Sequence, residues 1–192
     1  MPITRQNTTA YFLPMTEPTP ARKRASFSQD YLDTLLRYYE EEISGEAYFY
    51  GLVEAFEESG KVTLLARIER SAAQAIEPLL EKYALGPVNE KQLKDLGESE
   101  VTRHQGLNWH QFMTHIAERY PLYLDEFYAL EAMAPAEDLP LLQRLTEHEI
   151  AVIEFAEREL SGRPDSMQPL EQYLAHPDAH PDAGGIKGVG GN

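Results

Sequence analysis

Apolar residues recur every three or four positions over four long stretches of the chain. This spacing places them on one face of an α-helix. The stretches run from about residue 31 to 56, 64 to 83, 101 to 130 and 141 to 160. Helix-ending signals follow three of them, at Ser59-Gly60, Gly86-Pro87 and Ser161-Gly162. The pattern therefore predicts four long amphipathic helices.

Proline marks two of these helices as irregular. Pro78 predicts a kink in the second helix, and Pro121 predicts that the third is bent or split, because proline removes a backbone hydrogen bond. The polar segment 88–100 between the second and third helices predicts at most one short helical turn. The amphipathic segment 168–175 is expected to pack back on the helices.

An internal repeat relates the two halves of the chain. LLARIERSAAQAIEP (64–78) aligns with LLQRLTEHEIAVIEF (141–155) at a constant offset of 77 residues with five identities, and FYGLVEAF (49–56) resembles FYALEAMA (127–134). Two similar helical hairpins in tandem are typical of a four-helix bundle. We therefore predict an all-α fold for residues 28–175, an antiparallel four-helix bundle built from two helical hairpins.

The two ends of the chain differ from this pattern. Residues 1–27 contain four of the 13 prolines and no helical periodicity, which predicts an irregular N-terminal arm. Residues 176–192 contain five of the 12 glycines and few apolar side chains, which predicts a disordered C-terminal tail. A docking peptide within this tail is the alternative interpretation.

Composition excludes several classes of function. The formal charge of -15 opposes binding to nucleic acids and to anionic membranes, and the absence of cysteine excludes thiolate metal ligands and disulfides. The N-terminus lacks the apolar core of a signal peptide, and the chain contains no run of 18 apolar residues. We expect a single cytoplasmic domain. Because the chain has no cysteine, any metal must bind through oxygen or imidazole ligands.

Several carboxylates lie on the apolar faces of the predicted helices. Glu46 points inward on the first helix with Glu42 at the edge of its face, Glu69 lies at the rim of the second, and Glu149 lies in the middle of the fourth beside His148. A buried carboxylate costs several kcal/mol unless a cation or strong donors compensate it. We therefore predict a metal site inside the bundle.

The third helix offers two further carboxylates. Glu131 lies closer to the apolar face, whereas Glu126 lies nearer the level of Glu46 in the repeat, so either can complete the site. The alternative for each glutamate is that it reaches solvent or pairs with an arginine. The remaining histidines of the predicted helical region do not share one face and are interpreted as surface or linker groups: His104, His110 and His115.

Three segments carry a family resemblance: GEAYFYGL, LARIERSAAQAIEPLLEKYAL and LTEHEIAVIEFAERELSG. Residues 30 to 161 resemble the ferritin-like, rubrerythrin-type superfamily of four-helix bundles. In that superfamily, two glutamates and two Glu-x-x-His motifs hold two iron or manganese ions. The resemblance implies that Glu46 and Glu69 are the first two ligands.

The chain departs from the family pattern at both motifs. Ala72 stands where the second helix would carry its histidine, and Glu147-His148-Glu149 stands in place of the other motif. An oxygen-rich site favours manganese, iron or magnesium. The function implied is a metal-dependent oxidoreductase that uses O2 or peroxide on an unknown small molecule. Two alternatives are open: a metal-free helical module that binds a partner protein, and a bundle of the haem oxygenase or thiaminase type. A homodimer is compatible with each.

Overall fold

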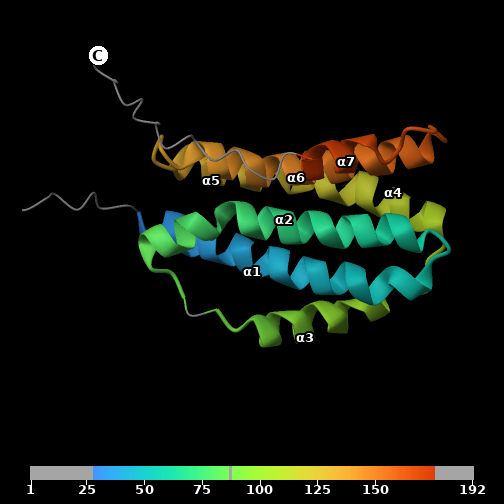
Figure 1. Ribbon diagram of the computed structural model, residues 1–192, viewed down its shortest axis with the longest axis horizontal. Coiled ribbons are helices and arrows are strands. Elements are labelled where there is room, and N and C mark those ends of the chain that lie inside the picture. The colour runs from blue at the N-terminus through green and yellow to red at the C-terminus, as the bar shows by residue number, and fades with distance from the viewer. Residues whose placement is uncertain (1–27, 87, 176–192) are drawn as a thin grey trace, which may run out of the picture.

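The computed structural model describes residues 28–86 and 88–175, and every regular element in this part of the chain is a helix (Figure 1). The all-α prediction is confirmed. The predicted N-terminal arm, 1–27, and the predicted C-terminal tail, 176–192, lie outside the described residues. The helices are α1 (Gln29–Leu52), η1 (Val53–Ala55), α2 (Ser59–Tyr83), α3 (Glu90–Glu100), η2 (Val101–Arg103), α4 (Trp109–Arg119), η3 (Tyr120–Leu122), α5 (Leu124–Met133), α6 (Leu139–Leu160) and α7 (Gln168–Ala175).

Local hydrogen bonds explain where several helices begin and end. The Ser28 side chain accepts a bond from the Tyr31 amide and caps α1, while Asn108 and Gln111 form a reciprocal capping box at the start of α4. α2 ends where Ala84 adopts a left-handed conformation with φ of 53°. No helix in the described ranges combines the length and the apolar character needed to cross a membrane.

Pro121 divides the third predicted helix. α4 stops at Arg119, the turn η3 contains the proline, and α5 starts at Leu124. The predicted split is confirmed. Pro78, in contrast, lies inside α2 without ending it.

The segment between the second and third predicted helices is more ordered than its composition indicates. Instead of one turn, it forms the 11-residue helix α3, which Asn89 caps and which packs along α1 (Figure 1). Gly97 explains the close packing, because a Cβ atom there would lie 2.0 Å from the backbone oxygen of Ser44. The contact is between two backbones, so the apolar pattern of the segment did not reveal it.

The helices enclose two apolar clusters. α1 packs along α2, α6 packs against α2, α4 and α5, and α5 also contacts α1. One cluster includes Phe49, Leu65 and Phe155, and the other includes Leu35 and Leu145. Along α1, α2 and α6, the two clusters are separated by a short stretch in which buried polar residues face the interior.

Candidate metal centre

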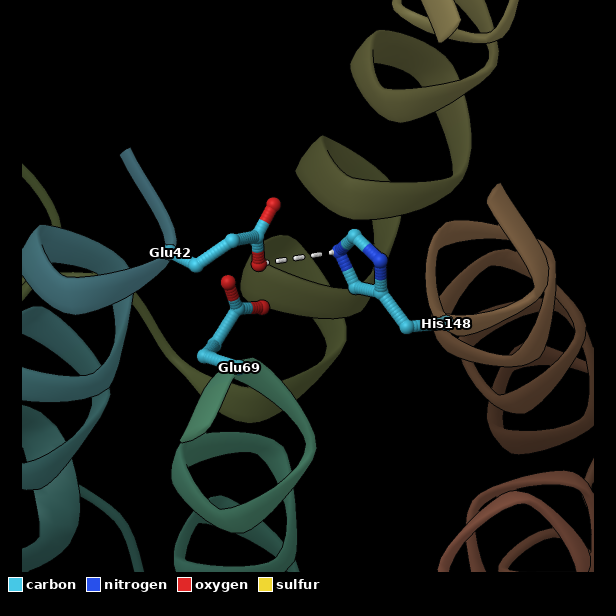
Figure 2. A group of neighbouring side chains, drawn as sticks. All are labelled: Glu42, Glu69 and His148. Carbon is cyan, nitrogen blue, oxygen red and sulfur yellow. Dashed lines mark ion pairs between the residues drawn. The ribbon is translucent and has the colours of Figure 1, made fainter. Parts of the chain in front are cut away.

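Glu42, Glu69 and His148 meet in the interior, one each from α1, α2 and α6 (Figure 2). Each side chain is less than 8% exposed, and each offers a ligand atom within 4.8 Å of the other two. Figure 2 shows the imidazole of His148 facing the two carboxylates. Glu149, which follows His148 on α6, is also buried.

Each polar residue interrupts an otherwise apolar helix face. On α1, buried side chains at Leu35 and Tyr38 precede Glu42, and Phe49 follows it on the same face. On α2, Glu69 lies between Leu65 and the buried residues that follow one turn later. Packing on both sides therefore fixes the level along the helix axes at which these side chains enter the interior.

The hydrogen bond on the far side of His148 defines its tautomer. Nδ1 contacts the carbonyl oxygen of Leu145, which can only accept, so Nδ1 carries the proton. Nε2 is left with its lone pair directed inward, 3.3 Å from Oε2 of Glu42 and 3.8 Å from Oε2 of Glu149. A histidine oriented in this way presents the nitrogen that binds metals.

Two carboxylate oxygens of the centre lack compensating donors. Oε2 of Glu42 and Oε1 of Glu149 are buried without a hydrogen-bond partner. Within the described ranges, the only basic side chain at ion-pair distance from Glu42 or Glu149 is His148, and none lies at that distance from Glu69. Buried polar atoms normally have partners, and a cation is one partner that these oxygens could bind.

Burial changes the protonation of the whole group. It raises the pKa of Glu42 well above its ordinary value, an effect that repulsion from Glu69 increases. Burial likewise raises the pKa of Glu69 to about 7, and it raises that of Glu149, which Glu69 also repels. The pKa of His148 falls to about 4 for the same reason. Without a cation the group is therefore largely protonated on its carboxylates and neutral on its imidazole.

Gly45 makes room for one of the ligands. A Cβ atom at this position would lie 2.6 Å from Oε2 of Glu69, closer than atoms can approach without moving. Gly45 is one turn after Glu42 on the same face of α1. The absence of a side chain thus lets the Glu69 carboxylate lie against the helix.

A cavity of about 340 Å³ adjoins the centre. Its walls include the three carboxylates and His148, together with aromatic side chains from α1, α5 and the turn around Pro121: Tyr38, Tyr48, Phe49, Tyr120, Tyr123 and Phe127. Arg37 and Glu126 lie 3.5 Å apart, and both line the cavity near its exposed side. A volume of this size suits a small molecule.

The structure places three of the predicted ligands elsewhere. Glu46, expected to point inward, forms an ion pair with Arg70. Glu42, expected at the edge of the same helix face, points inward instead. Glu126 is mostly exposed and pairs with Arg37, while Glu131 accepts a hydrogen bond from Thr146. α5 therefore contributes no ligand to the group that the structure brings together. Glu69, His148 and Glu149 lie in the interior, and metal binding by this group stays a prediction.

The donor set fits a divalent cation of the predicted kind. Carboxylate oxygens and one neutral imidazole suit iron or manganese, and four such residues match the needs of a single ion better than those of a pair. Scans against protein-family models, curated proteins and solved structures found no match for this chain. The interpretation of the site consequently depends on its geometry.

Proposed function

We propose that the protein is a metal-dependent oxidoreductase with a ferritin-like four-helix bundle, which binds iron or manganese through Glu42, Glu69 and His148. Glu149 supplies the fourth ligand. The helix contacts support this fold, because α1, α2, α6 and the split helix α4–α5 surround one interior. When bound, such an ion supplies the redox chemistry that amino-acid side chains lack.

The observation that carries the proposal is the set of buried oxygens without donors. Acidic side chains in a protein interior are normally paired, since an uncompensated charge costs several kcal/mol. Here three carboxylates from three helices face one imidazole, and oxygens of Glu42 and Glu149 lack any partner. A cation would compensate all of them at once.

The remaining residues would position a substrate and exclude water. Phe49 and Phe127 form apolar walls of the cavity, and Tyr120 brings a hydroxyl to the same space. Nε2 of His148 lies 3.3 Å from Oε2 of Glu42, so both side chains border the same space. The substrate is expected to be a small organic molecule.

Elemental analysis of the purified protein tests this proposal. Protein purified without chelators from iron- and manganese-supplemented cells should contain close to one equivalent of one metal. The Glu69→Gln and Glu42→Gln variants should lose it, while Glu46→Gln, which changes an acid outside the centre, should retain it. Addition of Fe²⁺ to the metal-free wild type should consume O2 faster than the same amount of Fe²⁺ with Glu69→Gln.

A metal-free outcome would favour the other function. If the wild type holds no metal after supplementation and consumes no O2 with Fe²⁺, the centre is vestigial. The metal-free module that binds a partner protein would then replace the oxidoreductase.

A further inference from the structure

A second cavity, of about 500 Å³, adjoins the one beside the metal centre. Gly45, Tyr48, Tyr120 and Tyr123 line both spaces, so the two cavities share a wall. The second cavity extends from this wall toward α3, η2 and α4. A molecule in it lies next to the aromatic side chains that border the centre.

The second cavity concentrates positive charge in an acidic protein. Arg103 and Arg119 line it together with His104 and His115, although the chain as a whole has a formal charge of -15. Among the described residues, Glu100 is the only acid in its lining, and Glu100 already forms an ion pair with Arg103. Such a concentration of cationic and imidazole groups favours an anion.

The two histidines are placed against the expectation from sequence. His104 and His115 were interpreted as surface or linker groups, yet both are half-buried, and their rings lie 4.4 Å apart. His110 is exposed, as expected. Burial lowers the pKa of both His104 and His115, and Arg119 adds to this effect at His115. Repulsion from a protonated His104 also lowers the pKa of His115, and an anion bound beside both rings would offset this repulsion.

Two further features show where an anion and the rest of its molecule could lie in the cavity. Among the described residues no carboxylate lies at ion-pair distance from Arg119, so its guanidinium is available to a ligand. The Tyr48 hydroxyl lies 2.8 Å from Nδ1 of His104, and Tyr48 also borders the cavity of the metal centre. Tyr48, one of the residues that line both cavities, therefore lies between His104 and the cavity of the metal centre.

We propose that the second cavity binds the anionic group of a small organic acid. Arg119 and the pair His104 and His115 contact this group, and the apolar body of the molecule extends past Tyr48 toward Glu42 and Glu69. The first part depends only on the second cavity, whereas the direction of the body rests on the proposed function.

Binding of phenylacetate to the full chain after removal of metals with EDTA tests the first part. Calorimetry should show phenylacetate binding at least tenfold more tightly than phenylacetamide, which has the same shape without the charge. Arg119→Gln should weaken phenylacetate binding at least tenfold. The matched control is Arg67→Gln, which removes the same charge from an exposed site on α2 that lines neither cavity. Its binding should equal that of the wild type.

Equal binding of acid and amide, or full binding by Arg119→Gln, would overturn the anion site. The second part, the direction of the apolar body, is tested by NMR after Mn²⁺ is added. The phenyl proton signals of bound phenylacetate should broaden in the wild type and sharpen in Glu69→Gln. If Mn²⁺ binds and the phenyl signals stay sharp, the direction of the body is refuted. If neither Mn²⁺ nor Fe²⁺ binds, the proposed function fails while acid binding in the metal-free protein stands.

Discussion

Two buried acidic regions of this protein differ in how their charge is compensated. Asp138, at the start of α6, is 1% exposed. It accepts hydrogen bonds from the hydroxyls of Tyr31 and Tyr83 at 2.8 and 2.6 Å, and Lys82 lies 2.5 Å away. Every one of these donors comes from another helix, so Asp138 connects α6 to α1 and α2.

The group around Glu69 shows the opposite arrangement. It holds three carboxylates and a neutral imidazole, and oxygens of Glu42 and Glu149 have no donor. A carboxylate with donors stabilises a fold, whereas carboxylates without donors reduce its stability until a ligand arrives. The difference therefore separates an acid that holds helices together from the acids that we propose as metal ligands.

Replacement of Asp138 should have the largest effect on stability. Asp138→Ala should lower the free energy of unfolding by roughly 3–5 kcal/mol, because it removes the buried carboxylate that accepts a hydrogen bond from the buried Tyr31 hydroxyl and that pairs with Lys82. Urea denaturation of the metal-free protein measures this. Glu137→Ala is the control, since Glu137 is 65% exposed and pairs with the same lysine at 3.5 Å. If Asp138→Ala lowers the free energy of unfolding by less than about 1 kcal/mol, the contrast between the two acidic regions is contradicted.

The pH dependence of stability should distinguish the second region. The pKa of Glu69 is raised to about 7 from an ordinary 4.5, so its contribution is fully present below pH 4.5 and is lost as pH rises to about 7. Relative to Glu69→Gln, the metal-free wild type should lose on the order of 3 kcal/mol across this range.

The titration of His148 changes stability with pH in the opposite direction. Comparing the wild type with Glu69→Gln cancels this contribution, because both proteins contain His148. Its lowered pKa, about 4, makes stability rise between pH 4 and its ordinary 6.5 in both proteins. Urea denaturation at intervals from pH 4.5 to 8 measures the difference between wild type and Glu69→Gln. A difference that is constant over this range would contradict the account.

A methyl group at Gly45 should weaken the metal site with little effect on folding. Gly45→Ala would displace the Glu69 carboxylate and lower metal affinity about tenfold, the usual size of effects on ligand orientation. Gly60→Ala is the matched control, because nothing lies within 4 Å of the added Cβ atom. Competition with a fluorescent chelator compares the two. Equal affinities would show that Glu69 does not bind where the structure places it.

Glu46→Gln should have the smallest effect. Glu46 and Arg70 form a partly exposed ion pair, and such pairs contribute about 0.5–1 kcal/mol. Its metal content should equal that of the wild type, which elemental analysis measures. Loss of metal in this variant would restore Glu46 as the first ligand.

Spacing on the helices explains which of the buried carboxylates could be predicted from the sequence. Glu149 lies in the middle of an apolar stripe on α6, and the structure buries it as expected. On α1 the predicted inward face included Glu46, but Tyr50, one turn further along that face, is 48% exposed. The stripe of α1 that contains Glu42 alternates by four and three residues. Its buried members are Tyr31, Leu35, Tyr38, Glu42, Phe49 and Leu52, and the half-buried Gly45 lies between Glu42 and Phe49.

Other parts of the site depend on contacts that a one-dimensional pattern does not contain. The pairing of Glu46 with Arg70 joins α1 to α2 across their shared edge. The cavity that holds His104 and His115 exists because α3 packs closely on α1, which follows from the lack of a side chain at Gly97. Backbone proximity of this kind leaves no apolar signal in the sequence.

Titration of the metal-free protein with Mn²⁺ tests the central claim most directly. The paramagnetic resonance signal of free Mn²⁺ should stay low until about one equivalent has been added to the wild type or to Glu46→Gln. With Glu69→Gln the signal should grow from the first addition. Free Mn²⁺ appearing at once with the wild type, together with no retention of Fe²⁺ in the same experiment, would contradict the assignment of these carboxylates as a metal centre.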